Sequence, residues 1–150
     1  MTRSKKEQTK PSAYWLMKSE PDVYPWSQLL ADQETRWEGV RNYEARNNLR
    51  AMKRGDLALF YHSNKGKEVV GIARIKQTFY QDPSTTEDWS VVDIEPVIGL
   101  KTYVTLQAIK AQPKLTEMAL LKKSRLSVGP VRPAEFEEIL RLSGTTLPEE

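Results

Sequence analysis

The sequence lacks cysteine, and its 150 residues include a single histidine, His62. The absence of cysteine excludes disulfides, thiolate zinc sites, iron–sulfur clusters and a cysteine nucleophile. One histidine excludes a metal site that needs several imidazole ligands, so we expect no metal. Glycine-rich phosphate loops, a dinucleotide fingerprint and a G-x-S-x-G nucleophile turn are also missing. We therefore expect no cofactor.

Long apolar runs are absent as well. No stretch approaches the roughly 18 consecutive apolar residues of a membrane-spanning helix, so we expect no membrane partner. No apolar run follows the basic N-terminus, so we expect no secretory signal. The composition, 39% hydrophobic and 29% charged, is typical of a globular protein in water. We expect a monomer in the cytoplasm of a bacterium, or in the nucleus if the source is a eukaryote.

The length suits one domain of about 100–200 residues, and the charges indicate where it begins. The net charge of +3 comes from the first twelve residues, because the rest of the chain is neutral. These residues are polar and show no hydrophobic periodicity. We predict a disordered basic tail at 1–12, a folded domain at 13–143 and a C-terminal tail at 144–150.

Inside the predicted domain, the charges are segregated along the chain. Residues 41–54 and 110–125 are mostly basic, whereas 77–100 contains acidic residues and neither Lys nor Arg. A neutral total can therefore hide one basic and one acidic face.

Hydrophobic periodicity and turn residues predict an α+β fold. The strands lie in the middle of the chain and are joined by hairpin-like turns, which favours a mostly antiparallel, curled sheet over a βαβ arrangement. We expect residues 32–42 to be irregular. The predicted strands are 14–17, 56–62, 69–80, 90–98 and 126–128, and the predicted helices are 25–30, 43–54, 105–111, 116–123 and 134–142.

The helix at 43–54 has a clear beginning, because Asn42 is a good N-cap. Arg46, Arg50 and Lys53 form a basic ridge beside its apolar stripe. Arg46 and Arg50 are candidate phosphate contacts. For Lys53 and Arg54 the alternative is a structural role, since the helix dipole favours cations near the C-terminus.

Three of the four tryptophans lie among polar or charged neighbours: Trp26, Trp37 and Trp89. Aromatic faces beside Arg and Lys can stack a nucleobase while the cations bind its phosphates. The alternative is that these rings close the ends of a small core.

His62 and Ser63 form the only adjacent base–nucleophile pair. Neighbours in a strand point to opposite faces, so we expect no catalytic residue and no enzyme. Two alternatives stay open: an enzyme that processes nucleic acid or nucleotides with His62, and a domain that docks a small ligand or a protein.

Four segments together strongly resemble the EVE domain, the family of thymocyte nuclear protein and its bacterial homologues. They are 14–21 (YWLMKSEP), 37–43 (WEGVRNY), 60–64 (FYHSN) and 124–128 (SRLSV). Each alone is weak, but all four occur in the family's order over one domain length. The resemblance covers about 14–142.

The resemblance implies a PUA-like fold, a small, curled, mostly antiparallel β-barrel with flanking helices. It also implies a non-catalytic module that recognises a modified base of DNA or RNA in an aromatic pocket. The residues implied to line or contact that pocket are Lys18, Ser19, Trp26, Trp37, Arg41, Asn42, Tyr43, Tyr61, His62, Ser63, Arg125 and Ser127.

Within that set, Trp26 and Trp37 are candidate stacking faces. Asn42 or Ser127 would recognise the hydrogen-bonding edge of the base, together with backbone groups near residues 18–19. Arg41 and Arg125 would bind flanking phosphates alongside Arg46 and Arg50.

Overall fold

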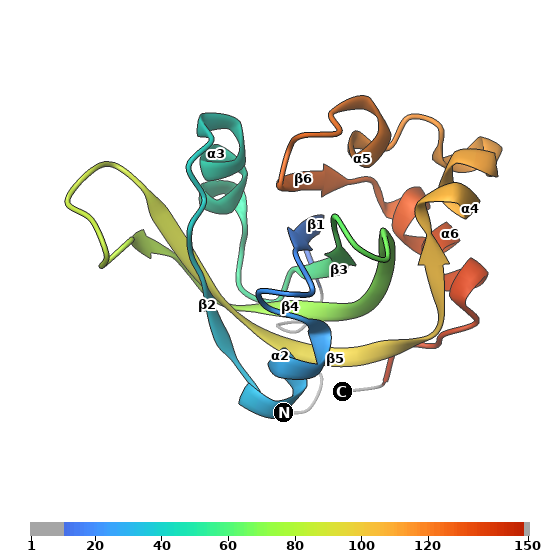
Figure 1. Ribbon diagram of the computed structural model, residues 1–150, viewed down its shortest axis with the longest axis horizontal. Coiled ribbons are helices and arrows are strands. Elements are labelled where there is room, and N and C mark those ends of the chain that lie inside the picture. The colour runs from blue at the N-terminus through green and yellow to red at the C-terminus, as the bar shows by residue number, and fades with distance from the viewer. Residues whose placement is uncertain (1–10, 149–150) are drawn as a thin grey trace.

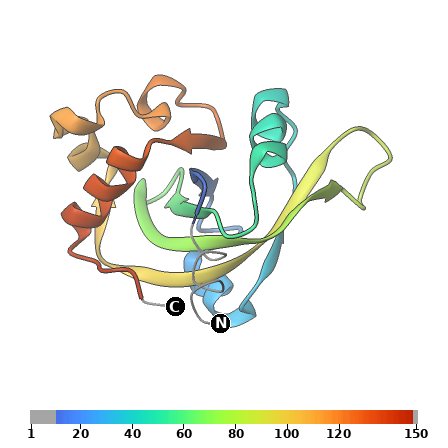
Figure 2. The same ribbon diagram turned by 180° about the vertical axis from the view of Figure 1, so that it is seen from behind.

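The computed structural model describes residues 11–148, so most of the predicted basic tail at 1–12 lies outside the described residues. The fold is built on one six-stranded sheet. Figures 1 and 2 show its two long strands sweeping beneath the shorter ones as a curved ribbon. In spatial order the strands are β2 (Thr35–Trp37), β5 (Ser90–Thr105), β4 (Glu68–Gln81), β3 (Leu57–His62), β1 (Tyr14–Ser19) and β6 (Val128–Val131).

The α+β class and a mostly antiparallel, curled sheet are confirmed, but the sheet is not closed into the expected barrel. The sheet is mixed, because β1 pairs in parallel with β3 while the other pairs are antiparallel. It is also open, with β2 at one edge and β6 at the other. Register shifts along β4 and β5 bend the sheet strongly. Within the described residues β2 and β6 do not pair with each other, so the curl does not close.

The helices lie at both ends of this sheet (Figure 1). On one side, α3 stands beside the projecting β4–β5 hairpin; on the other, the C-terminal helices cover the end of β5. The helical elements are α2 (Trp26–Asp32), α3 (Tyr43–Ala51), α4 (Leu106–Ala111), the 3-10 turn η1 (Pro113–Leu115), α5 (Ala119–Lys122) and α6 (Pro133–Ser143). None of the helices within residues 11–148 is long and apolar enough to cross a membrane.

Helix α3 begins where predicted, since the Asn42 side chain accepts a hydrogen bond from the Ala45 N–H at 2.9 Å. It ends at Ala51, before the predicted end at residue 54. The buried Asp56 carboxylate accepts the Lys53 N–H at 2.9 Å and turns the chain into β3.

Other helix and strand boundaries differ from the prediction because pairing with distant strands, rather than the local hydrophobic pattern, determines where they begin and end. Strand β2 falls in the segment expected to be irregular, and it forms because Trp37 pairs with Val92 of β5. Strand β5 runs to Thr105 rather than residue 98, paired with β4 across bulges. The helix predicted at 116–123 shrinks to α5, and the strand predicted at 126–128 lies at β6.

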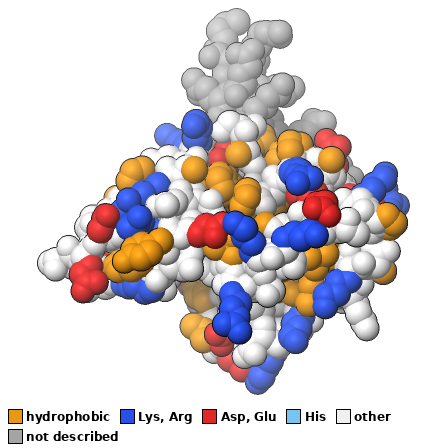
Figure 3. All heavy atoms as spheres, turned by 90° about the horizontal axis from the view of Figure 1, so that it is seen from above, with side chains coloured by type: hydrophobic (Ala, Val, Ile, Leu, Met, Phe, Trp, Pro, Cys, Tyr) orange, Lys and Arg blue, Asp and Glu red, His pale blue; other side chains and the backbone are white. Residues whose placement is uncertain are grey.

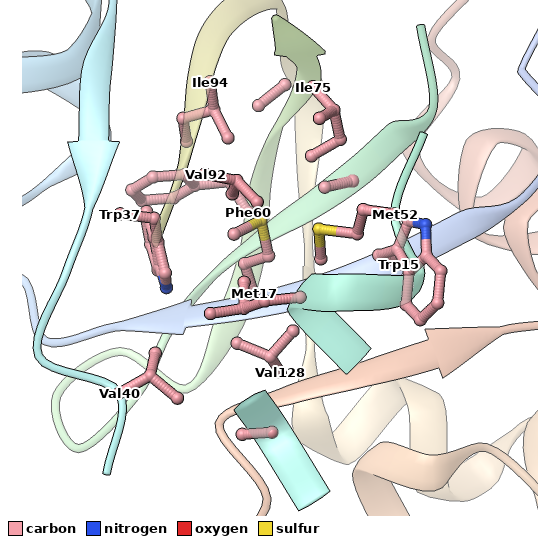
Figure 4. Close-up of a cluster of buried hydrophobic side chains, with 14 of the residues drawn as sticks. Trp15, Met17, Trp37, Val40, Met52, Phe60, Ile75, Val92, Ile94 and Val128 are labelled. Atoms are coloured by element: carbon pink, nitrogen blue, oxygen red, sulfur yellow. The ribbon is translucent and has the colours of Figure 1, made fainter. Parts of the chain in front are cut away.

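Two hydrophobic clusters occupy the two faces of the central strands. On β3, Phe60 belongs to the first cluster, and Leu59 and Tyr61 belong to the second, as the two-residue period of a strand requires. Figure 4 shows the first cluster, in which Trp37, Phe60 and Met17 lie together. It packs against α2 and α3, whereas the second packs against α4, α5 and α6.

Candidate functional site

A pocket of about 930 Å³ opens at the C-terminal ends of β1 and β3. We call it the β1–β3 pocket. The loop after β2 forms one wall, and the loop that leads into β6 forms the opposite wall. Its lining residues are Lys18, Ser19, Glu20, Val23, Tyr24, Thr35, Arg36, Trp37, Glu38, Gly39, Val40, Arg41, Tyr61, Ser63, Asn64, Lys67, Leu106, Leu120, Ser124, Arg125 and Ser127.

Parallel pairing of β1 with β3 brings distant motifs to this opening, because it places Lys18 opposite Tyr61 and Ser19 opposite His62. The Lys18 backbone N–H donates to the Ser127 carbonyl at 2.9 Å. The Lys18 ammonium donates to the Ser124 carbonyl at 2.8 Å. Three of the four family segments are therefore hydrogen-bonded or strand-paired to one another, and the fourth supplies Trp37.

The aromatic lining consists of Tyr24, Trp37 and Tyr61. Trp37 is 8% exposed and meets Phe60 edge to face, with ring centroids 5.7 Å apart. Tyr61 is 3% exposed, and burial raises the pKa of its hydroxyl. The sequence interpretation did not include Tyr24, whose hydroxyl donates to Asp32 at 2.8 Å. Its place five residues after the Lys18–Ser19 step is the signal that could have identified it.

Trp26 and His62 lie beneath the pocket rather than in its lining. The Trp26 ring lies against Gly71, where a Cβ atom would come within 2.5 Å of the indole. The Trp26 backbone N–H donates to His62 Nε2 at 3.0 Å. Burial lowers the pKa of His62, although Glu68 opposes the shift. The imidazole is therefore a neutral acceptor that holds the start of α2.

This arrangement argues against His62 as a general base. A base needs a free lone pair within hydrogen-bond reach of its substrate or nucleophile. The Nε2 lone pair already accepts the Trp26 N–H. Within the described part of the chain, His62 and Ser63 form no hydrogen bond to each other. The same residues contain no group of His, Cys, Asp and Glu that could hold a metal ion.

A second cluster lies between α3 and the β4–β5 hairpin. We call it the hairpin patch: Tyr43, Arg46, Arg50, Asp88 and Trp89. Tyr43 stacks on Trp89 with ring centroids 5.3 Å apart. Arg46 lies 3.4 Å and Arg50 2.5 Å from the Asp88 carboxylate. Tyr43, Arg46 and Arg50 therefore lie outside the pocket lining, as does the helix cap Asn42.

Arg41 joins the two regions. It lines the pocket, and its guanidinium lies 3.1 Å from the buried Asp82 carboxylate and 5.5 Å from the Trp89 ring centroid. Hydrogen bonds from Ser84, followed by the Arg41 charge, hold the pKa of Asp82 below its usual value. The rim of the pocket and the hairpin are thus tied by one ion pair.

The cations around the pocket differ in their partners. Arg36 pairs with Glu38 at 3.5 Å and Arg41 with Asp82. Among residues 11–148, Lys67 and Arg125 form no ion pair with a carboxylate. Figure 3 shows Lys and Arg side chains across the α4–α6 side of the upper face, and basic, acidic and apolar groups side by side at the hairpin end. The interpretation of the sequence missed Lys67, which lies in the β3–β4 turn with φ +51°.

Comparison with known proteins gives this geometry a context. The family model described as the EVE domain matches residues 13–142. Thymocyte nuclear protein 1 of Mus musculus is 38% identical over 169 residues, covering 89% of this chain and 75% of that protein. Rpa0253 of Rhodopseudomonas palustris is 49% identical with a TM-score of 0.85, covering 88% of this chain and 93% of that one.

Two further structures contain nucleic acid. Human THYN1 in complex with DNA that contains 5-methylcytosine is 36% identical with a TM-score of 0.80, covering 90% of this chain and 99% of that one. A YTH domain of Zygosaccharomyces rouxii, in complex with N6-methyladenosine RNA, has a TM-score of 0.58 over 93% of this chain and 92% of its own. At 13% identity, that likeness concerns the fold alone. The matched residues and the relatives together identify the family: this chain belongs to the EVE-domain proteins.

Proposed function

We propose that this chain is a non-catalytic module that recognises a modified base of a nucleic acid in the β1–β3 pocket. The observation that carries the proposal is the pocket itself, which lies where the family's four segments meet. Its volume of about 930 Å³ and its walls of Trp37, Tyr24 and Tyr61 suit a flat, extruded base. The 5-methylcytosine DNA in the human relative supports the same ligand class.

The energies involved are compatible with such a role. Extruding a base from a duplex costs a few kcal/mol, and less where pairing is already weak. One base–aromatic contact contributes about 1–3 kcal/mol. A methyl group adds roughly 1 kcal/mol of apolar burial. Discrimination between modified and plain bases is therefore modest per contact, and it depends on several groups acting together.

The proposed roles follow the positions of the side chains. Lys18, Ser19, Ser63 and Ser127 are close enough to the opening to contact the base or its sugar, and Arg41 and Arg125 lie at the rim. The proposed ligand contacts are therefore these six residues together with Trp37 and Tyr61. Three further residues support the site from outside its lining: Trp26, His62 and Asn42. The residues of the hairpin patch contact the nucleic acid only if it extends across that patch; they are Tyr43, Arg46 and Arg50.

Binding assays with short oligonucleotides test the proposal. Fluorescence polarisation would compare DNA and RNA strands, single and duplex, that carry cytosine, 5-methylcytosine, 5-hydroxymethylcytosine, adenine or N6-methyladenine. We expect at least one modified base to bind about fivefold to tenfold tighter than its plain counterpart, which corresponds to about 1 kcal/mol. Equal affinity for every strand, or no binding, would contradict the proposal.

The cellular location and the monomeric state stay predictions. The mouse relative is called a nuclear protein by its name.

A further inference from the structure

Two aromatic side chains in the pocket carry polar atoms that nothing in the described chain satisfies. Trp37 and Tyr61 are both more than nine-tenths buried. Neither the Trp37 indole N–H nor the Tyr61 hydroxyl has a hydrogen-bond partner among residues 11–148. Neither atom is sealed from solvent. Each therefore faces an open space while the rest of its ring is packed.

Three comparable groups elsewhere in the molecule are satisfied. The buried Trp15 indole N–H donates to Asp56 at 2.9 Å. The Tyr24 and Tyr80 hydroxyls donate to carboxylates at 2.8 Å and 2.5 Å. Buried Tyr and Trp usually find such partners, because an unmet donor costs about 1–3 kcal/mol when it is cut off from water. The indole N–H of the buried Trp26 also has no partner among residues 11–148, but Trp26 lies outside the lining. What distinguishes Trp37 and Tyr61 is that they line the pocket.

The backbone positions both groups at the opening. Pairing of Trp37 with Val92 places the indole at the edge of the first hydrophobic cluster. Figure 4 shows its nitrogen turned toward Val40, a lining residue, and away from Val92. On β3, Tyr61 belongs to the second hydrophobic cluster, so its ring lies on the opposite face of the strand from Phe60 and Trp37. Its neighbour across the strand pair is Lys18, another lining residue.

We propose that the Trp37 N–H recognises the hydrogen-bonding edge of the bound base, and that the Tyr61 hydroxyl binds a second polar group of the ligand at the other side of the pocket. This inference rests on the proposed function and assigns it a chemistry. Trp37 supplies a donor to a ring nitrogen or carbonyl oxygen of the base. Tyr61 supplies a hydroxyl that can donate or accept. Trp37 was expected to offer a stacking face, and the structure adds a polar edge to its role.

This proposed contact also requires that the recognised base is unpaired. In a base-paired duplex, the acceptors on the pairing edge are already occupied by the opposite strand. A base whose pairing edge meets the Trp37 N–H must therefore be extruded from a duplex or belong to a single strand.

Substitutions that remove one polar atom and keep the ring test this inference. Trp37→Phe and Tyr61→Phe would be compared with wild type for binding to a 5-methylcytosine DNA strand. We expect each to weaken binding about threefold to tenfold, the effect of one uncharged hydrogen bond. Thermal unfolding should be little changed, since no protein partner loses its bond. Tyr14→Phe is the matched control: its ring stacks on Phe136 outside the pocket, and its affinity should match wild type.

A fourth variant separates the two proposals. Trp37→Leu removes the aromatic face as well as the N–H. If it abolishes the preference for the modified strand while Trp37→Phe and Tyr61→Phe bind within twofold of wild type, the polar-edge inference is overturned and the proposed function stands. If wild type binds no modified strand more tightly than its plain counterpart, the proposed function fails, and this inference fails with it.

Discussion

The β1–β3 pocket and the hairpin patch contain the same kinds of side chain and differ in how those side chains are satisfied. Both combine tryptophan, tyrosine and arginine. In the hairpin patch, Arg46 and Arg50 share Asp88, and Tyr43 stacks on Trp89. In the pocket, the Trp37 N–H, the Tyr61 hydroxyl and two cations have no partner within the described residues, and both polar atoms are open to solvent. The clearest difference is in charge: the hairpin patch pairs its arginines with its own carboxylate, whereas Lys67 and Arg125 at the pocket form no ion pair within residues 11–148.

The hairpin patch has its own structural role. Its rings and ion pairs hold the projecting hairpin against α3, and Arg41 carries this connection to the pocket rim. Exposed pairs of this kind contribute about 0–1 kcal/mol each, so the patch adds stability through several small contacts. In the pocket, part of the hydrogen-bonding capacity is not used by residues 11–148.

The largest expected effect comes from replacing one tryptophan in each region with leucine. Trp37→Leu should lower the affinity for a modified strand by up to about 100-fold, since a base–aromatic contact is worth about 1–3 kcal/mol. Trp89→Leu should lower it less than about threefold, since its ring already stacks on Tyr43. Fluorescence polarisation measures both, with thermal melting as a check on folding. If the two variants lose similar amounts of affinity, the distinction between the pocket and the hairpin patch is wrong.

A second pair of variants tests the connection between the regions. Asp82→Asn would remove a buried negative charge that meets Arg41, and we expect it to destabilise the fold by about 1–3 kcal/mol. Asp88→Asn is its counterpart in the hairpin patch. The Asp88 side chain is 75% exposed, so its loss should cost less than about 1 kcal/mol.

Urea denaturation of the Asp82→Asn and Asp88→Asn proteins would measure both costs. An Asp88→Asn protein that is less stable than the Asp82→Asn protein would reverse the ranking.

The contrast also explains which parts of the site the sequence could predict. Lys18, Ser19, Tyr61 and Ser63 lie together in the pocket because β1 and β3 pair in parallel, and the family segments identified them without that pairing being known. Helix α3 was predicted from its cap and apolar stripe, which are local signals.

The remainder depends on contacts between distant residues. Trp26 is buried because Gly71 leaves room for its ring, a fit between positions that no local pattern displays. Strand β2 forms only because β5 accepts it. Lys67 belongs to the site because its turn returns to the pocket. Pairing of Arg46 and Arg50 with Asp88 likewise depends on how the hairpin folds back onto α3.

A smaller effect is expected from single cations. Lys67→Gln and Arg125→Gln should each reduce the slope of log affinity against log salt by about 1, as the loss of one phosphate contact does. Arg46→Gln and Arg50→Gln should change this slope little, because Asp88 already neutralises part of their charge. Titrations at several salt concentrations measure the slopes. A larger change for the α3 arginines would move the phosphate path onto the hairpin patch.

The smallest expected effect is a pH dependence of stability that separates the two regions. Burial lowers the pKa of His62 below its usual 6.5, so the unfolded chain takes up a proton before the folded one does. The contribution of the neutral His62 to the free energy of unfolding is complete above pH 6.5, and it is lost as the pH falls through the pKa of His62 in the folded protein. The pKa of Asp82 is held below its usual 3.8, mainly by Ser84, so its contribution is lost only in the more acidic range below 3.8.

Urea denaturation between pH 8 and about pH 2 would resolve these two windows. In His62→Gln, an amide oxygen can still accept the Trp26 N–H but does not titrate, so the decline that begins near pH 6.5 should become shallower while the acidic one persists. Asp82→Asn should show the opposite pattern. If His62→Gln leaves the upper window unchanged, the hydrogen bond from Trp26 to His62 does not couple protonation to folding. The support beneath the pocket would then rest on the packing of Trp26 against Gly71.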